Sequence, residues 1–199
     1  MSEFVNSIEL LGDETVLKSL ISRTIVEFRD NIIMNVGQNA FSYCYYMTTA
    51  DLPNVETIGL SAFSNCTALV SINIPKLKSV PTTGFNNTRF ESISLPNVVS
   101  INMNGFNDCI NLKLVDLYNI NTISTGAFKN SALESLIIRR EDTVPTLRSV
   151  NAFEGTPIYT GNGYIYVPAS MVDLYKKASN WSSYAPQIRA IEDYPDICG

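Results

Sequence analysis

The chain has 199 residues, of which 45% are hydrophobic, so it is long enough and apolar enough to bury a core. Its formal net charge is −5, from 14 Lys and Arg against 19 Asp and Glu, which supplies no basic field for the phosphates of a nucleic acid. No apolar run approaches the roughly 20 residues of a membrane helix, and the N-terminus lacks the pattern of a signal peptide. We therefore expect no nucleic-acid partner and no membrane insertion.

Residues 1–24 precede the first repeat and are predicted to form an N-terminal cap. Asp13 can accept hydrogen bonds as the N-cap of a short helix over residues 14–21, whose apolar side chains recur at helical spacing. The first predicted strand covers residues 25–28 and opens the repeated part of the chain. We expect that part to extend over residues 25–168.

A phenylalanine recurs through the chain at intervals of 22, 22, 21, 22 and 25 residues. An Ala or Gly precedes it each time, and an Ile or Val stands five residues before each of the first five copies. The recurring residues are Phe41, Phe63, Phe85, Phe106, Phe128 and Phe153. A fixed period of this length is typical of a solenoid, in which stacked coils bury a common core that no single coil could bury.

Between one phenylalanine and the next, a short run of alternating Ile, Leu and Val residues predicts a strand, and residues 70–74 are the clearest copy. Pro75 follows this run, and because proline has no N–H to donate it ends the strand. We predict about six coils of 21–22 residues, each with one strand in a parallel sheet and one ring in a continuous phenylalanine spine. The small residue before each Phe is expected to leave room for the neighbouring coil.

Residues 169–199 depart from the repeat and are predicted to form a C-terminal cap that shields the open end of the core. A last strand over residues 164–167 leads into an amphipathic helix over residues 169–178. Its inward side chains, and those that complete the lid, are Met171, Val172, Tyr175, Trp181, Tyr184, Ile188 and Ile191. The whole chain is thus predicted to be one structural domain of the α/β class, a parallel-sheet solenoid with a short N-terminal capping helix and a helical C-terminal cap.

The segment from Ile58 to Pro75 follows the pattern I-G-x-x-A-F-x-x-C-x-x-L-x-x-I-x-I-P. With this motif the chain resembles the BspA-like leucine-rich-repeat family over about residues 25–168, and residues 166–191 are similar to the C-terminal cap of gut bacterial and phage-encoded members. The resemblance implies a non-catalytic leucine-rich-repeat solenoid. It also implies relatives that include bacterial surface adhesins, which bind host or matrix proteins, and prophage-encoded proteins. The compartment stays open, with the cell surface or a phage particle as candidates if the chain belongs to a longer or exported product.

The chain contains no histidine, which removes the commonest general base and the favoured nitrogen ligand of zinc. The carboxylates Asp51 and Asp116 stand on predicted strands three coils apart, or about 14 Å at the strand spacing. Inverting glycosidases place their carboxylates roughly 6.5–9.5 Å apart. We therefore expect no enzyme activity, no catalytic residue, no metal and no cofactor.

Three cysteines, Cys44, Cys66 and Cys109, stand three residues after their Phe, where other coils have Thr or Ser. The position selects a small and mildly polar side chain, so we expect buried reduced thiols, although neighbouring strands would bring Cys44 and Cys66 within disulfide range. The residue just before it is Asn or Asp in four coils and is predicted to form a buried amide ladder that satisfies the turning backbone. These four residues are Asn65, Asn87, Asp108 and Asn130.

The outward positions of the strands form the candidate ligand-binding face, because their neighbours along each strand point inward to the core. These positions are Thr49, Asp51, Ser71, Asn73, Ser92, Ser94, Leu114, Asp116, Ser135, Ile137, Tyr164 and Tyr166. A second candidate is the loop of residues 139–143, which interrupts the repeat. The cluster Tyr43, Tyr45 and Tyr46 either belongs to such a surface or supports the N-terminal cap.

These features predict a non-catalytic binding module that recognises a protein or a glycan through the strand face, by shape and hydrogen bonding. Small polar residues fill the middle of that face, and tyrosine, which is favoured at interfaces, stands at its C-terminal end. The alternative is a passive structural spacer, or a phage virion-associated protein, without a specific ligand. The sequence leaves the oligomeric state and the identity of the ligand open.

Overall fold

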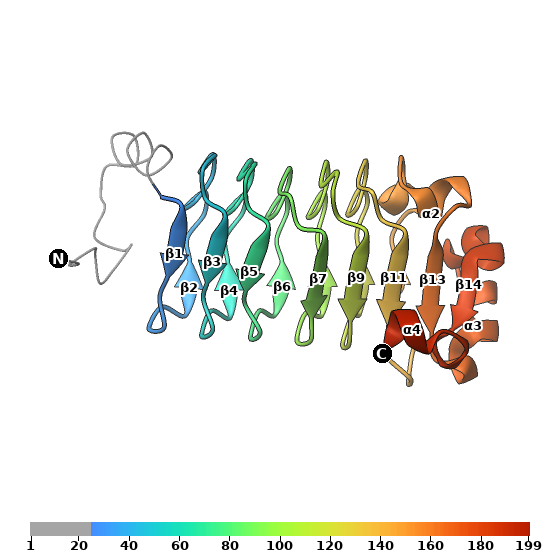
Figure 1. Ribbon diagram of the computed structural model, residues 1–199. Coiled ribbons are helices and arrows are strands. Elements are labelled where there is room, and N and C mark those ends of the chain that lie inside the picture. The colour runs from blue at the N-terminus through green and yellow to red at the C-terminus, as the bar shows by residue number, and fades with distance from the viewer. Residues whose placement is uncertain (1–24) are drawn as a thin grey trace.

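The computed structural model describes residues 25–199, which form a solenoid of stacked coils (Figure 1). Each of its first six coils contains a longer strand, a shorter strand and a turn that carries the recurring phenylalanine. All strand pairs are parallel, and equivalent residues of neighbouring coils face each other, as Thr49 faces Ser71. The predicted α/β solenoid with a parallel sheet is confirmed, while the predicted N-terminal cap and its helix over residues 14–21 lie outside the described residues.

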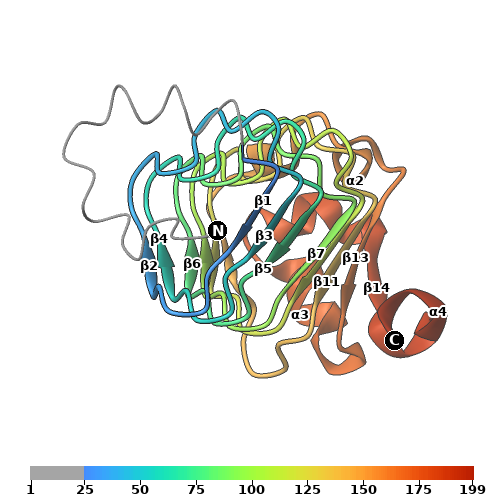
Figure 2. The same ribbon diagram turned by 60° about the vertical axis from the view of Figure 1, so that its left-hand side comes forward.

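The strands form two rows on opposite sides of the core (Figure 2). We call the first row the long-strand side: β1 (Glu27–Arg29), β3 (Thr49–Asp51), β5 (Ser71–Asn73), β7 (Ser92–Leu95), β9 (Leu114–Leu117), β11 (Ser135–Ile138), β13 (Tyr164–Val167) and β14 (Ile188–Ala190). The short-strand side has β2 (Asn35–Val36), β4 (Thr57–Ile58), β6 (Ser79–Val80), β8 (Ser100–Ile101), β10 (Thr122–Ile123) and β12 (Thr146–Leu147). Only the first row was expected from the sequence, because strands of two residues are too short to show an alternation.

Both rows are interrupted at the coil that carries β5 and β6. The long-strand side divides into β1-β3-β5 and β7-β9-β11-β13-β14, and the short-strand side into β2-β4 and β6-β8-β10-β12. On the short-strand side the cause is Pro81. The residue after a short strand donates its N–H to the preceding coil, as Gly59 does to the carbonyl of Val36 at 2.8 Å, but Pro81 has no N–H to give to Ile58.

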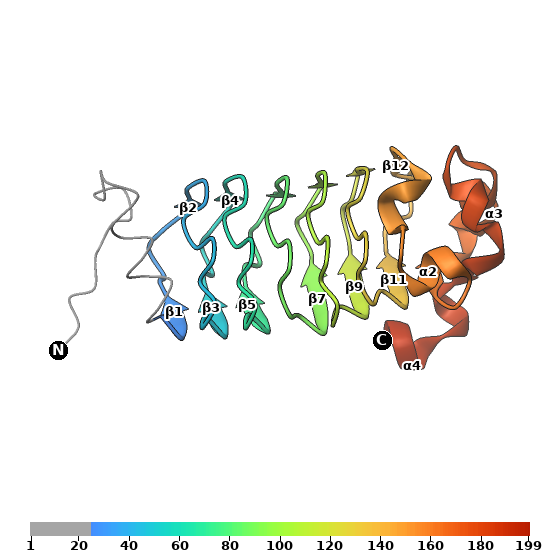
Figure 3. The ribbon, with the colours of Figure 1, turned by 90° about the horizontal axis from the view of Figure 1, so that it is seen from above.

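The coils stack along one axis (Figure 3). The recurring phenylalanines form the spine of the core. Their rings are at most 2% exposed, and the centroids of neighbouring rings lie 5.0–5.8 Å apart. At Gly105 the small residue before the ring leaves room for the neighbouring coil, as predicted. A Cβ on Gly105 would lie 2.9 Å from Cγ1 of Val80 in the preceding coil, so a side chain there would force the two coils apart.

The turn around each phenylalanine depends on left-handed backbone, with φ between 53° and 78° two residues before or after the ring. The left-handed residues two positions after each phenylalanine are Tyr43, Asn65, Asn87, Asp108, Asn130 and Gly155. This conformation turns each N–H toward the next coil, so that Asn65 donates to the carbonyl of Asn86 at 2.8 Å. The predicted amide ladder is partly present, since Nδ2 of Asn87 donates to Oδ1 of Asn65 at 3.0 Å, but these side chains are not buried. The tolerance of Asn and Asp for positive φ explains their choice better than burial does.

The residues from Val150 onward cover the last turn of the spine and the end of the core. Their helices are η2 (Val150–Phe153), α2 (Pro157–Thr160), η3 (Ala169–Met171), α3 (Val172–Lys177), η4 (Trp181–Gln187), η5 (Ile191–Asp193) and α4 (Pro195–Cys198), where η denotes a 3-10 helix. The predicted helix over residues 169–178 is thus a 3-10 turn followed by a short α-helix, with Met171 and Tyr175 buried as expected. The strand β14, which extends the sheet beyond β13, was not expected. None of the described helices is long and apolar enough to cross a membrane.

The cysteines are free thiols, and all four are buried. The thiol of Cys66 donates to the carbonyl of Phe41 at 3.0 Å, and that of Cys109 to the carbonyl of Phe85 at 3.1 Å. Each of these two thiols thereby adds a hydrogen bond to a carbonyl in the phenylalanine turn. The expectation of buried reduced thiols is confirmed.

Burial raises the pKa of Cys109 from its ordinary value of 9.0 to about 11. Folded protein at pH 8 is therefore expected to react with a thiol reagent such as DTNB far more slowly than unfolded protein, in which all four thiols should titrate. Between pH 9 and pH 11 the unfolded state loses this proton while the folded state keeps it, so the free energy of unfolding should fall across this range. Rapid reaction of the folded protein, or fewer than four thiols after unfolding without reductant, would contradict this.

Candidate functional site

The long-strand side carries all twelve predicted ligand-binding positions, but they are not equally accessible. Five are exposed: Ser71, Asn73, Ser92, Ser94 and Tyr164. Four are half-buried: Thr49, Asp51, Leu114 and Ser135. Three are buried: Asp116, Ile137 and Tyr166, so the prediction that they are exposed is wrong. The accessible part of the face therefore lies mainly on β5 and β7.

The C-terminal residues bury one outward position of β11, Ile137, and one of β13, Tyr166. Ile137 and Tyr166 are 1% and 2% exposed, and both pack against Cys198 of α4. The rings of Tyr166 and Tyr194 lie 5.3 Å apart, edge to face. Burial also raises the pKa of the Tyr166 hydroxyl. These residues pack the C-terminal segment onto the solenoid and are not available as ligand contacts.

Asp116 is held by an ion pair with Arg139. Nε of Arg139 lies 2.9 Å from Oδ1 of Asp116, and its Nη2 lies 3.1 Å from Oδ2, so the contact is bidentate. The hydrogen bonds to Asp116 raise the pKa of Arg139. Arg139 also donates to the carbonyl of Cys198 and lies 5.2 Å from the ring of Tyr118. Asp116 thus helps to fasten the C-terminal segment.

A crevice with a volume of about 660 Å³ opens on the long-strand side between β5 and β7. Its polar lining includes Ser71, Arg89, Glu91, Ser92, Ser94 and Asn111. Three of these residues belong to the predicted ligand-binding face. The structure therefore places the exposed centre of that face at the walls of a crevice, where β5 and β7 form no ladder.

A shortened turn precedes β7 at the edge of the crevice. Two residues separate Thr88 from Glu91, whereas three separate Cys66 from Val70 at the matching positions of the preceding coil, which also explains the 21-residue interval from Phe85 to Phe106. Within the described residues neither the N–H of Glu91 nor that of Ser92 donates to the carbonyl of Val70, although the equivalent bonds exist in the neighbouring coils.

Chemically, the crevice offers hydrogen-bonding groups without a net charge. It combines serine hydroxyls with backbone groups that the missing ladder leaves unpaired, and such strand edges are ready to pair with a ligand. Arg89 and Glu91 have opposite signs, and Nη1 of Arg89 already donates to Oδ1 of Asn87 at 2.9 Å. The lining suits an uncharged polar group better than an anion or a cation.

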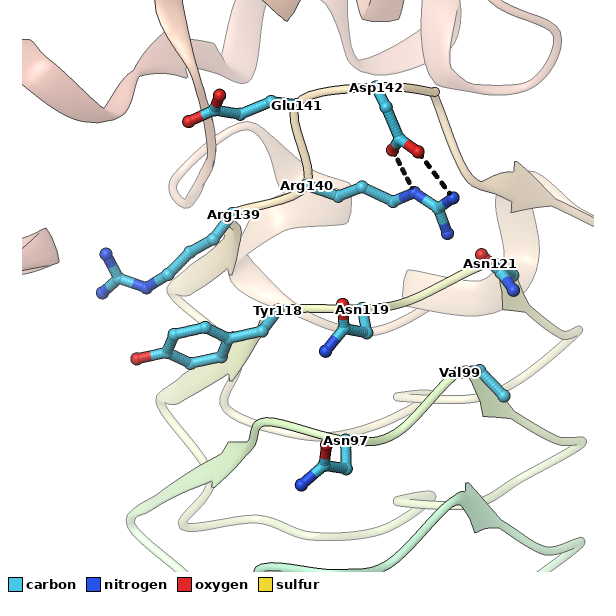
Figure 4. A pocket seen from close by; sticks show the side chains of 9 residues that line it. All are labelled: Asn97, Val99, Tyr118, Asn119, Asn121, Arg139, Arg140, Glu141 and Asp142. Atoms are coloured by element: carbon cyan, nitrogen blue, oxygen red, sulfur yellow. Dashed lines mark hydrogen bonds and ion pairs between the residues drawn. The ribbon is translucent and has the colours of Figure 1, made fainter.

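The loop of residues 139–143, the second predicted candidate, borders a hollow of about 600 Å³ (Figure 4). Both of its arginines are engaged within the protein. Arg140 contacts Asp142 through two nitrogens, one of them Nη2 at 3.1 Å from Oδ2, and Arg139 is paired with Asp116. No unpaired cation is left in this loop, so it offers less to a ligand than the crevice does.

Across residues 25–199, no group of three or more His, Cys, Asp or Glu side chains is arranged to hold a metal ion. The arrangement on the long-strand side can present hydrogen-bond donors and acceptors to a ligand.

Comparison with known proteins places the repeat in a family. The family model "BspA type Leucine rich repeat region" matches residues 34–158 with six copies. No curated protein matches the chain significantly. A solved leucine-rich cell surface protein from Faecalibacterium prausnitzii is 20% identical, with a TM-score of 0.48 over 71% of this chain and 47% of that one.

Two further solved leucine-rich-repeat proteins are similar to the chain. The one from Bacteroides ovatus is 23% identical, with a TM-score of 0.46 over 73% of this chain and 52% of that one. The one from Eubacterium ventriosum is 26% identical, with a TM-score of 0.46 over 68% and 44%. The chain spans about half the length of the solved structures it matches. Because the family model covers more than half of its residues, the chain belongs to the BspA-type leucine-rich-repeat family.

Proposed function

We propose that this chain is a non-catalytic binding module that recognises a protein or a glycan through its long-strand side. The observation that carries the proposal is the polar crevice between β5 and β7, where Ser71, Ser92 and Ser94 line a volume of about 660 Å³. At this crevice the ladder between β5 and β7 is missing, and its walls carry three of the five exposed positions of the predicted face.

The charge and composition of the crevice support recognition by shape and hydrogen bonding. Its opposite charges are balanced, and its serines offer hydroxyls that both donate and accept. Ligand sites of this kind use a concave surface with a few well-placed polar groups to fix orientation. The family resemblance supports an adhesin-like role, on the surface of a gut bacterium or on a prophage-encoded particle.

The Ser92→Trp variant tests this proposal. The indole should fill the crevice and weaken ligand binding by about tenfold or more, because it displaces the ligand from the centre of the face. Binding of wild type and variant would be measured by biolayer interferometry against immobilised matrix proteins and a panel of glycans. Thr146→Trp is the matched control, since Thr146 is an exposed strand residue on the short-strand side. It should bind as wild type does.

Two outcomes would contradict the proposal. If the wild type binds nothing in the panel, the passive spacer or virion role gains support. If Ser92→Trp and Thr146→Trp bind as the wild type does, the ligand uses a surface other than the crevice. The fold of each variant would be checked by circular dichroism.

A further inference from the structure

Three tyrosines crowd the turn between Phe41 and β3. Tyr43, Tyr45 and Tyr46, which we call the tyrosine turn, are 52%, 48% and 59% exposed. The rings of Tyr43 and Tyr45 lie 5.9 Å apart, edge to face. Large aromatic side chains usually gain stability by burial, and these three give up much of that gain. Their exposure needs a reason other than packing the core.

The backbone of Tyr43 supplies independent evidence. Its φ is 64°, and its N–H donates to the carbonyl of Ser64 at 2.8 Å, so the ladder between coils imposes the left-handed conformation. The five other coils have Asn, Asn, Asp, Asn and Gly at this position. Those residues tolerate positive φ, whereas for a bulky aromatic residue such a φ is unfavourable. The chain thus keeps a strained residue where its own repeat offers an unstrained one, which is typical of functional positions.

The surroundings of the tyrosine turn indicate what it binds. Residues 42–48, and residues 64–69 in the next coil, contain no charged side chain. None of the three phenol hydroxyls makes a hydrogen bond within the described part of the chain. In these two segments a ligand meets aromatic faces and free hydroxyls but no charged side chain.

We infer that the tyrosine turn is a separate binding site that holds a sugar ring of a neutral glycan. The C–H face of a pyranose packs on an aromatic ring, while its hydroxyls can bond to the phenol groups. Acidic polysaccharides and charged peptides find no counter-charge in this turn. The inference does not depend on the crevice. Val70 on the near wall of the crevice donates its N–H to the carbonyl of Thr48 at 3.0 Å, but Ser92 on the far wall stands two strands from β3, or about 10 Å at the strand spacing.

Two variants test the inference: Tyr45→Ala, which removes one ring, and Tyr43→Asn, which restores the residue type of the other coils. Wild type and variants would be applied to a printed array of neutral oligosaccharides built from glucose, galactose, mannose and N-acetylglucosamine. Affinities for the strongest binder would then be measured by calorimetry. Each variant should bind about tenfold or more weakly. Tyr43→Asn should also raise Tm by roughly 2–4 °C, because it relieves the strain.

Tyr43→Asn should bind the glycan more weakly and yet unfold at a higher temperature, and these opposite effects separate a binding role from a structural one. A residue that only packed would lose stability when replaced. Tyr159→Ala is the matched control, because Tyr159 is 47% exposed but lies on α2 at the other end of the solenoid, and it should bind as wild type does. Ser92→Trp should also keep its binding to the neutral glycan, which distinguishes this site from the crevice.

Three results would overturn the inference. The first is that the wild type binds no neutral glycan on the array. The second is that Tyr43→Asn and Tyr45→Ala bind as the wild type does. The third is that Tyr43→Asn has a lower Tm than the wild type. Binding to protein ligands alone would also count against it.

Discussion

Replacing Phe85 with alanine is expected to lower the free energy of unfolding by about 3–5 kcal/mol, the usual range for removing a buried aromatic ring. Phe85 is 0% exposed, and its ring lies 5.6 Å from that of Phe63 and 5.4 Å from that of Phe106. The substitution leaves a cavity between three coils. For a chain of this length, Tm should fall by roughly 6–20 °C. Urea unfolding followed by circular dichroism would measure the loss.

Phe128→Ala is the matched comparison, because Phe128 is equally buried and stacked on both sides. Phe85 stands in the coil of β5 and β6, where the ladder to β7 is missing and Pro81 interrupts the ladder to β4. Side-chain stacking therefore contributes a larger share of the cohesion there, and the Phe85 variant should lose more stability than the Phe128 variant. A loss below about 1 kcal/mol in either would mean that the spine is not a continuous core.

The register of the coils could be predicted because one residue type recurs at a fixed interval. Each ring must contact the rings before and after it, so the spacing of Phe63, Phe85 and Phe106 determines how the coils align. The two-residue strands of the return path show no alternation and were missed. Their pairing depends on backbone bonds, such as that of Gly59 to Val36, to which the side chains give no clue.

The exposure of the candidate face was predicted correctly in its middle, but two residues near its C-terminal end were predicted to be exposed and are buried. Ser71 and Ser92 are exposed because the alternation along their strands is a local property. Ile137 and Tyr166 are buried by α4, which comes from a part of the chain with no repeat, so no local pattern could place it over them. The 21-residue interval after Phe85 records the shortened turn before β7. The turn before β11 is equally short and the ladder of β11 with β9 is intact, so this spacing alone could not locate the crevice.

The tyrosine turn also left a signal in the sequence. An aligned repeat shows Tyr43 in a column of Asn, Asp and Gly. That departure can be interpreted only once the structure shows that the residue at this position has a positive φ in every coil. In a repeat protein the other coils act as an internal reference, and a residue that departs from them at a strained position is a candidate for function.

Trp181→Ala should lower the free energy of unfolding by roughly 3–5 kcal/mol, about as much as the loss of a spine ring, but it removes contacts at one end of the molecule. Trp181 is 1% exposed, lies 6.2 Å from Phe153 and 5.1 Å from Tyr175 between ring centroids, and donates from Nε1 to the carbonyl of Pro145 at 2.7 Å. Because each coil contacts only its neighbours, the damage should stay near the end. Hydrogen exchange measured by mass spectrometry should rise in β11 and β13 and stay unchanged in β3 and β5.

Trp181→Phe separates the two contributions of the indole. Phenylalanine keeps an apolar ring over Phe153 but leaves the buried carbonyl of Pro145 without its donor, which should cost about 1–3 kcal/mol. The exchange of β11 and β13 should then rise less than in Trp181→Ala. If the alanine variant instead accelerated exchange equally from β1 to β13, the coils would unfold as a single unit. The interrupted ladders around β5 and β6 argue against that, because they leave the coil of Phe85 with fewer backbone bonds to its neighbours.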